Sequence, residues 1–279
     1  SVSAKDRESV LSSALSNTHS GITYCEEYSI KRKDGHTIWV SDTYSITSAP
    51  GMPVSVQGVL VNITRRKRIE IAQAAIYRIS QAAYAVNTPE ELYPLIHNAL
   101  RDMMPADNFY ISLYDSKTDL LQFPYFVDEV DQSPVTHKPG RGLTEYVIRK
   151  GQPLFAPPEI FNQLVEEGEV ESIGAPSVDW LGVPLKVRDR TIGAMALQSY
   201  TEGVRFDTDD LEMLTFVSTQ VAMVIERKRA EVALHNSENI YHSTIDSLDE
   251  FIHMVDADYR VVMANQSFRR FNHQNGVEE

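Results

Sequence analysis

The sequence predicts an α+β fold, in which antiparallel sheets are flanked by helices and joined by helical linkers. Three observations support the prediction. The dipeptide Asp34-Gly35 separates two β-rich runs, and Asp-Gly in such a place is typical of a tight hairpin turn. Apolar residues recur every three or four positions from Ile69 to Val86, which indicates a long helix. Strand and helix patterns then alternate over residues 109–225.

Composition and charge limit the possible functions of the 279 residues, which carry a net charge of −13. At about 150 residues per domain, this length predicts roughly two domains. The acidic balance disfavours contact with nucleic acid. The single cysteine, Cys25, excludes an internal disulfide framework and a multi-cysteine metal site. No run approaches the ~18 apolar residues of a membrane span, and no signal-peptide pattern opens the chain at Ser1. We therefore expect a cytoplasmic segment, cut from a longer protein, without membrane contact.

The first 62 residues are expected to form a short helix and then a three-stranded antiparallel meander. The helix is predicted within residues 1–20, where apolar residues recur once per helical turn. The turn at Asp34-Gly35 connects the first two strands. A second turn at Ala49-Pro50-Gly51 leads into the third strand, over residues 54–61.

The helix that follows carries a regular apolar stripe. Its spacing of three and four residues is the a/d pattern of a coiled coil, and two interpretations are open. The stripe either packs on the domain that follows it or pairs with the same helix of a second chain, and the regular spacing favours the parallel dimer. Alanines in the stripe suit a helix that shifts its packing. The predicted dimer seam consists of Ile69, Ala72, Ile76, Ile79, Ala83 and Val86.

The middle of the chain is predicted to mix helices with hairpin strands. Thr88, Pro89 and Glu91 form a capping box at the start of a helix. Residues 151–185 contain six acidic residues and neither lysine nor arginine, and we expect a solvated helix and loops there. Strands are predicted over 109–114, 120–126, 180–187 and 191–198, with a short helix over 143–149.

The last part is predicted to be helical and then to form a hairpin. Asp207 and its acidic neighbours place a cap and negative charge at a helix start. The helix is expected to run to about residue 236, and a new helix is expected from Ser237 to Leu248. Residues 251–256 and 260–263 have the pattern of a hairpin.

The chain contains no recognisable catalytic constellation. A P-loop, a cyclase Gly-Gly-Asp-Glu-Phe motif and a kinase phospho-acceptor pattern are all missing, so we assign no catalytic residue. The histidines lack metal-ligand spacing, and we assign no metal site; His97 is expected to be a surface or partly buried imidazole. The basic runs 65–68 and 227–229 lie beside glutamates, which favours ion pairs on helices over a binding surface.

Residues 1–64 resemble the C-terminal part of a PAS domain with its trailing PAC segment. The resemblance includes an Asp-Ile-Thr type of signature before a basic helix start, in which Asn62 replaces the commoner aspartate. This replacement is expected to alter the contact that ties the last strand to the linker. The matching segments are Glu27-Tyr28-Ser29-Ile30, Lys33-Asp34-Gly35, Trp39-Val40 and residues 58–68.

Residues 74–226 resemble a GAF domain, preceded by a linker helix over 65–88 that continues into it. A second linker helix over 227–247 leads to residues 248–279, which resemble the N-terminal part of another PAS domain. The GAF resemblance rests on Gly140–Gly151, Trp180-Leu181-Gly182-Val183-Pro184-Leu185, Ile192-Gly193-Ala194 and the helix over 209–225. The second PAS resemblance rests on Ser237-Glu238-Asn239, Val255-Asp256-Ala257-Asp258 and Ala264-Asn265.

The resemblance implies a sensory segment of a multidomain signalling protein, such as a sensor histidine kinase. The alternatives are the sensory part of a diguanylate cyclase or phosphodiesterase, and a dimerisation scaffold without a ligand. We expect a homodimer in which the GAF pocket takes a small molecule of unknown identity; no cofactor is assigned. The bilin-attachment cysteine and the cyclic-nucleotide signature of some GAF domains are missing. The candidate ligand-binding residues are Tyr110, Tyr125, Arg141, Tyr146 and Trp180.

Overall fold

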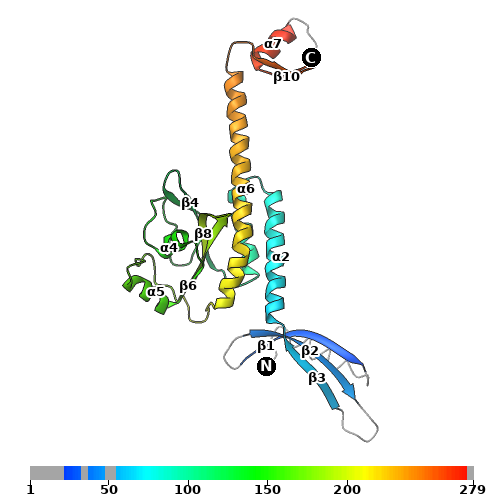
Figure 1. Ribbon diagram of the computed structural model, residues 1–279, viewed down its shortest axis with the longest axis vertical. Helices are drawn as coiled ribbons and strands as arrows, with labels where there is room; N and C mark the ends of the chain where they lie inside the picture. The colour runs from blue at the N-terminus through cyan, green and yellow to red at the C-terminus, as the bar shows by residue number, and fades with distance from the viewer. Residues whose placement is uncertain (1–21, 33–36, 48–54, 275–279) are drawn as a thin grey trace.

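The computed structural model describes residues 22–32, 37–47 and 55–274 and has three parts along its long axis (Figure 1). A three-stranded sheet lies at one end, a sheet with helices on both faces lies in the middle, and a small hairpin unit lies at the far end of a long helix. The predicted helix within residues 1–20 and the two predicted turns, at 34–35 and 49–51, lie outside the described residues.

The N-terminal sheet is the predicted antiparallel meander. Strands β1 (Thr23–Lys31), β2 (Thr37–Thr47) and β3 (Ser55–Asn62) pair in chain order. The register aligns Tyr28 with Val40, and Val40 with Asn62. Every residue of β3 is exposed, so this sheet has little core of its own.

Helix α2 (Thr64–Ala85) is attached to the meander by polar contacts at its first turn. The Thr64 hydroxyl donates to Oδ1 of Asn62 at 2.6 Å and accepts from the backbone N–H of Trp39 at 3.0 Å. The asparagine therefore retains an acceptor where the signature usually has aspartate. Glu27 of β1 pairs with Lys67 at 2.7 Å and with Arg66 at 2.5 Å. The hydrogen bonds from Lys67 and then Arg66 lower the pKa of the Glu27 carboxyl.

The central domain is built on a five-stranded antiparallel sheet of order β5-β4-β8-β7-β6. In such a sheet, successive side chains of one strand point to opposite faces. Side chains that are paired across neighbouring strands point to the same face. The strands are β4 (Asn108–Asp115), β5 (Leu120–Val127), β6 (Leu154–Ala156), β7 (Asp179–Val187) and β8 (Arg190–Ser199). The helices are α2, α3 (Pro89–Arg101), α4 (Leu143–Lys150), α5 (Pro158–Glu166) and α6 (Thr208–Asp246).

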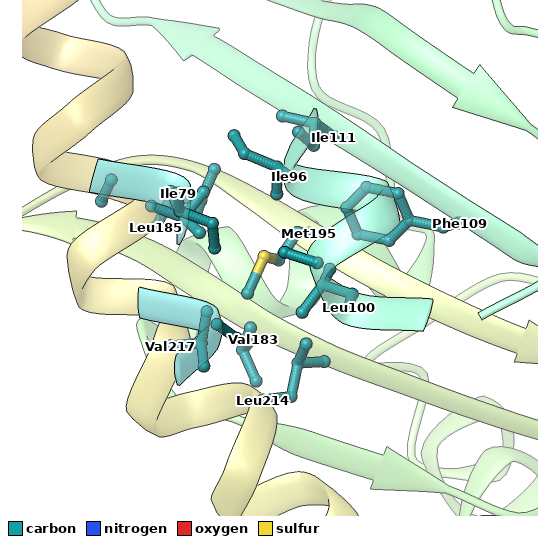
Figure 2. Packing of buried hydrophobic residues seen from close by; sticks show 14 of the residues in the cluster. Ile79, Ile96, Leu100, Phe109, Ile111, Val183, Leu185, Met195, Leu214 and Val217 are labelled. Atoms are coloured by element: carbon teal, nitrogen blue, oxygen red, sulfur yellow. The ribbon is translucent and has the colours of Figure 1, made fainter. Parts of the chain in front are cut away.

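The main core lies between one face of this sheet and helices α2, α3 and α6. Figure 2 shows their side chains converging around Met195 of β8. Phe109, Leu181 and Leu214 come from a strand, a second strand and α6, and all three are fully buried. Burying apolar surface on this scale is the dominant stabilising contribution to a domain.

The stripe on α2 packs inside this core, which corrects its assignment as a dimer seam. Ala72, Ile79 and Ala83 are 2%, 0% and 3% exposed, and Ile76 and Val86 pack against the same cluster. Of the six predicted positions only Ile69 is exposed. Helix α2 contacts α6 along its length and also contacts α3. A helix packed on its own domain produces the same three-four spacing as a coiled coil, and alanines allow the two helices to approach closely. A charge introduced at Ile79 would therefore disrupt the fold itself.

Three further predictions need correction, two of them in the second half of the chain. Helix α6 runs without a break through residue 237, where a restart was expected. Residues 151–185 contain the expected helix, α5, but also strand β6, which pairs with β7. In addition, the carboxylate of Glu91 accepts from the N–H of Asn87 rather than from that of the N-cap, Thr88.

The C-terminal unit contains the predicted hairpin, β9 (His253–Val255) with β10 (Val261–Ala264), followed by α7 (Gln266–Gln274). Asn265 fastens it to the end of α6. Its side-chain amide donates to the carbonyl of Glu250 at 2.8 Å and to that of Ile245 at 3.2 Å. Its Oδ1 accepts from the N–H groups of Ile252 and Phe268, both at 3.1 Å.

A buried carboxylate holds the start of α6 against the sheet. Asp179 of β7 is 0% exposed and accepts from Arg205 Nε at 2.8 Å and from the N–H of Phe206 at 2.9 Å. Asp207 then caps the helix in a reciprocal capping box with Asp210. The position of α6 on the sheet therefore depends on Asp179, the first residue of β7.

The substitution Asp179→Asn tests this attachment. It removes the charge and one acceptor from a buried site, so we expect the free energy of unfolding to fall by about 1–3 kcal/mol. Glu202→Gln is the matched control, because Glu202 pairs with the same Arg205 at 2.9 Å but is 82% exposed. The control should lose less than about 1 kcal/mol. Urea denaturation followed by circular dichroism measures both, and equal losses would contradict the attachment.

Candidate functional site

The second face of the central sheet borders a cavity of about 640 Å³. Strands β4, β5 and β7 form its floor, α4 and α5 lie beside it, and the segments around residues 131–137 and 171–177 close it. Aromatic rings and carboxylates are the two kinds of side chain that characterise the lining. The rings belong to Tyr110, Phe123, Phe126, His137, Phe161 and Trp180, and the carboxylates to Asp131, Glu145 and Glu171.

A buried hydrogen-bonded group forms the floor of the cavity. The indole N–H of Trp180 donates to the Tyr110 hydroxyl at 3.1 Å, and that hydroxyl lies 2.7 Å from Oγ1 of Thr144 on α4. Burial raises the pKa of Tyr110 to about 12, so the phenol is neutral at ordinary pH. Gly182 makes room for the indole, because a Cβ there would lie 2.0 Å from the Trp180 ring.

Glu145 and His137 form the polar wall of the cavity. Glu145 lies in the first turn of α4 and is only 7% exposed. Its Oε1 accepts from the N–H of Gly140 at 3.3 Å and lies 3.4 Å from Nε2 of His137. The His137 ring stacks on Phe123, with 5.9 Å between ring centroids. The loop before α4 therefore holds a carboxylate at the cavity surface.

The loop segments over the cavity are tied together by two aspartates. Asp131 accepts from the N–H of Ala175 at 3.0 Å, joining the two closing segments. Tyr200 donates to Asp128 at 3.0 Å, and Gln198 Nε2 donates to the same carboxylate at 2.8 Å. Burial, followed by the charge of Asp128, raises the pKa of Tyr200. These bonds anchor the closing segments to the end of β8.

Of the five predicted ligand-binding residues, Tyr110 and Trp180 line the cavity, and the other three do not. Tyr125 pairs with Ile111 in the sheet, so it faces the main core, where its hydroxyl lies 2.9 Å from Nδ1 of His97. His97 is buried there, more deeply than expected, and burial lowers its pKa.

Arg141 and Tyr146 also lie away from the cavity lining. Nη2 of Arg141 points toward Gly168, since a Cβ added there would lie 3.9 Å from it. The Tyr146 ring lies under the cations of Arg149 and Lys150, at 5.5 and 5.4 Å. Sequence reasoning missed Thr144 and Glu145, although an acidic residue three positions after the Gly142 N-cap was a visible signal of a structured helix start.

A second hollow, of about 870 Å³, lies between the meander and the base of the two long helices. Arg68 of α2 lines it and pairs with Asp207 at 3.7 Å and with Asp209. The predicted pairing of the basic runs with acidic residues is confirmed here and at Lys228, which lies 2.9 Å from Glu231. The pairing of Arg68 with Asp207 and Asp209 joins the start of α2 to the start of α6.

The described residues form neither a metal-binding cluster nor a membrane-spanning helix. No group of three or more histidine, cysteine, aspartate or glutamate side chains in the described ranges is placed to hold a metal ion. Over the same part of the chain, no helix is both long enough and apolar enough to cross a membrane.

Comparison with known proteins identifies the domains. A model of the GAF domain matches residues 86–226, and a model of the PAS fold matches residues 1–60. The Nif-specific regulatory protein of Sinorhizobium fredii is 24% identical over 157 residues, which are 56% of this chain and 26% of that protein. The chain thus spans about a quarter of that relative's length.

Solved structures of low identity are similar to part of this chain. One is the GAF domain of a phosphoenolpyruvate-protein phosphotransferase from Coxiella burnetii, at 18% identity and a TM-score of 0.47, covering 58% of this chain and 96% of that one. Another is the free methionine-R-sulfoxide reductase of Neisseria meningitidis, at 17% identity and 0.45, covering 57% and 91%. Since the GAF model matches half of its residues, the chain belongs to the GAF domain family and carries a PAS region before the GAF domain.

Proposed function

We propose that this chain is the sensory segment of a signal-transduction protein, in which a small molecule bound in the GAF cavity changes the packing of α2 and α6. One observation carries the proposal: the same strands line the cavity with one face and hold the two long helices with the other. In β4, Tyr110 faces the cavity and its neighbour Phe109 faces the helices. In β7, Trp180 faces the cavity and Leu181 faces the helices.

A continuous set of contacts connects the cavity to the PAS region. Trp180 lines the cavity, and the adjacent Asp179 holds the start of α6 through Arg205. Arg68 joins that start to α2, and the preceding residue, Lys67, pairs with Glu27 of the PAS sheet. A ligand that binds two packings of these elements unequally shifts the balance between them.

For the whole protein, we propose a cytoplasmic sensor histidine kinase. The preference rests on how often PAS and GAF domains precede kinases, and a diguanylate cyclase or phosphodiesterase is the alternative output. A third reading is a scaffold that binds no ligand. The relative of 24% identity is named a regulatory protein, which supports a regulatory role but does not distinguish between these outputs.

We also propose a homodimer, formed by an outer stripe of α6 rather than by the buried stripe of α2. Phe216, Met223, Leu234 and Tyr241 are exposed and recur at heptad-related spacings of 7, 11 and 7 residues. Beyond residue 228 none of the described residues of the helix is buried. A helix with so little packing of its own is marginal in water, and a parallel partner helix would cover the stripe.

Ligand binding is tested by thermal denaturation of the full chain with panels of amines, amino acids, carboxylates, nucleotides and haem. A compound that binds the native state raises the midpoint. Ala175→Phe is the control, because it places a ring in the cavity lining while leaving its backbone N–H free to bond Asp131. We expect at least one class to stabilise the parent chain and not the variant. Absence of any such difference would support the scaffold instead.

The dimer is tested by disulfide cross-linking in a Cys25→Ser background, because Cys25 is exposed. Leu234→Cys lies on the proposed stripe, and Asn236→Cys, two residues along the same exposed helix, points to the other side. Under mild oxidation we expect Leu234→Cys to give a covalent dimer at least about tenfold faster, because disulfides need close Cα atoms. Equal rates, or a monomer mass by light scattering, would contradict this interface.

A further inference from the structure

We infer that the GAF cavity selects an organic cation, an amine or quaternary ammonium group carried on an apolar body. The inference rests on the proposed function and adds the charge class of the ligand. It comes from the composition of the lining: aromatic rings and carboxylates, with no lysine or arginine among the described residues that form it.

Three carboxylates face the cavity, and they differ in their exposure and in the hydrogen-bond partners that the protein gives them. Asp131 is engaged by the N–H of Ala175 and lies 3.3 Å from the Tyr200 hydroxyl. Glu171 is exposed at the rim. Glu145 is 7% exposed, and while its Oε1 faces Gly140 and His137, its Oε2 has no hydrogen-bond partner among the described residues. An unpaired oxygen on a carboxylate that is otherwise largely buried can accept from a ligand's donor or pair with its positive charge.

Glycine keeps this oxygen uncovered. A Cβ at Gly142 would lie 2.7 Å from Oε2 of Glu145, so a side chain there would displace or cover the carboxylate. The same lining is aromatic, with Tyr110 stacked on Phe126 at 5.3 Å between ring centroids. Carboxylates beside aromatic faces are the usual surroundings of bound ammonium groups, because both attract a cation.

His137 is the one basic side chain among the described lining residues, and it does not reverse the charge. Its Nδ1 lies 2.8 Å from the carbonyl of Val135, which can only accept, so Nδ1 carries the proton. With a second proton on Nε2, the ring neutralises one of the three carboxylates, and the lining stays negative. An anionic ligand would enter this negative lining without a lysine or arginine to pair with its charge.

The size of the cavity suits one small molecule. At about 640 Å³ it falls within the range of small-ligand sites, roughly 300–1,000 Å³. The surrounding segment 151–185 contains acidic residues and neither lysine nor arginine, so its charge also attracts a cation toward the closing loops. Arg141, which would have favoured an acidic ligand, lies outside the lining.

The test compares three probes of similar size and different charge: 2-phenylethylamine, 2-phenylethanol and 3-phenylpropionate. Calorimetric titration of the full chain should give the amine at least about tenfold higher affinity than the other two. Glu145→Gln should remove most of that preference while leaving the affinity for the alcohol unchanged. Glu159→Gln, an exposed glutamate of α5 outside the lining, should leave all three affinities unchanged.

Tighter binding of the carboxylate, or an amine preference that survives Glu145→Gln in a chain with the parent circular dichroism spectrum, would overturn the inference. If Glu145→Gln does not fold, Glu171→Gln at the exposed rim replaces it and should weaken amine binding at low salt. If none of the three probes binds, the charge inference also fails. The broader panel with Ala175→Phe then decides separately whether the cavity binds any small molecule.

Discussion

The close packing of α2 against α6 on one face of the central sheet is the interaction on which the rest of the structure depends. Ala72, Ala75 and Ala83 are small enough for the two helices to approach, and Ile79 fills the space between them and the sheet. The two helices run side by side along the domain, and α6 alone continues past it to the hairpin unit (Figure 1). Because cores are packed as densely as organic crystals and transmit strain, we propose that a change on one face of the sheet reaches these helices.

The two faces of the sheet have different roles as a consequence. The face toward the helices is mainly apolar and supplies stability, whereas the other face carries Tyr110 and Trp180, which bond with each other and with Thr144, and it borders a cavity. Asp179 lies where the two roles meet, next to Trp180 in β7 and bonded to the residues that start α6. Polar contacts then continue through Arg68 to the PAS sheet, so the molecule has a physical route between its domains.

Much of the fold could be predicted from the sequence, because strand alternation and turn residues act locally. The meander, the hairpin β4–β5 and the pair β7–β8 all follow from such patterns. The partner of a helix is a different matter, since the spacing from Ile69 to Val86 fits an intrachain neighbour as well as a second chain. Tyr110 and Trp180 could be predicted as residues of the site. Whether Tyr125 lines the cavity depends on which face of β5 it occupies, and its register with Ile111 fixes that face. Glu145 and His137 meet only after the loop before α4 has folded.

The most direct test of the shared core is amide hydrogen exchange of the full chain, resolved to peptides from α2, β4 and β8. If α2 belongs to the core, residues 72–83 should exchange with an opening free energy within about 1 kcal/mol of that for β4 and β8, because a cooperative unit opens together. A contradictory result would be α2 amides that exchange at the rates of an isolated helix while β4 and β8 remain protected. In that case the two long helices would not be part of the GAF domain core.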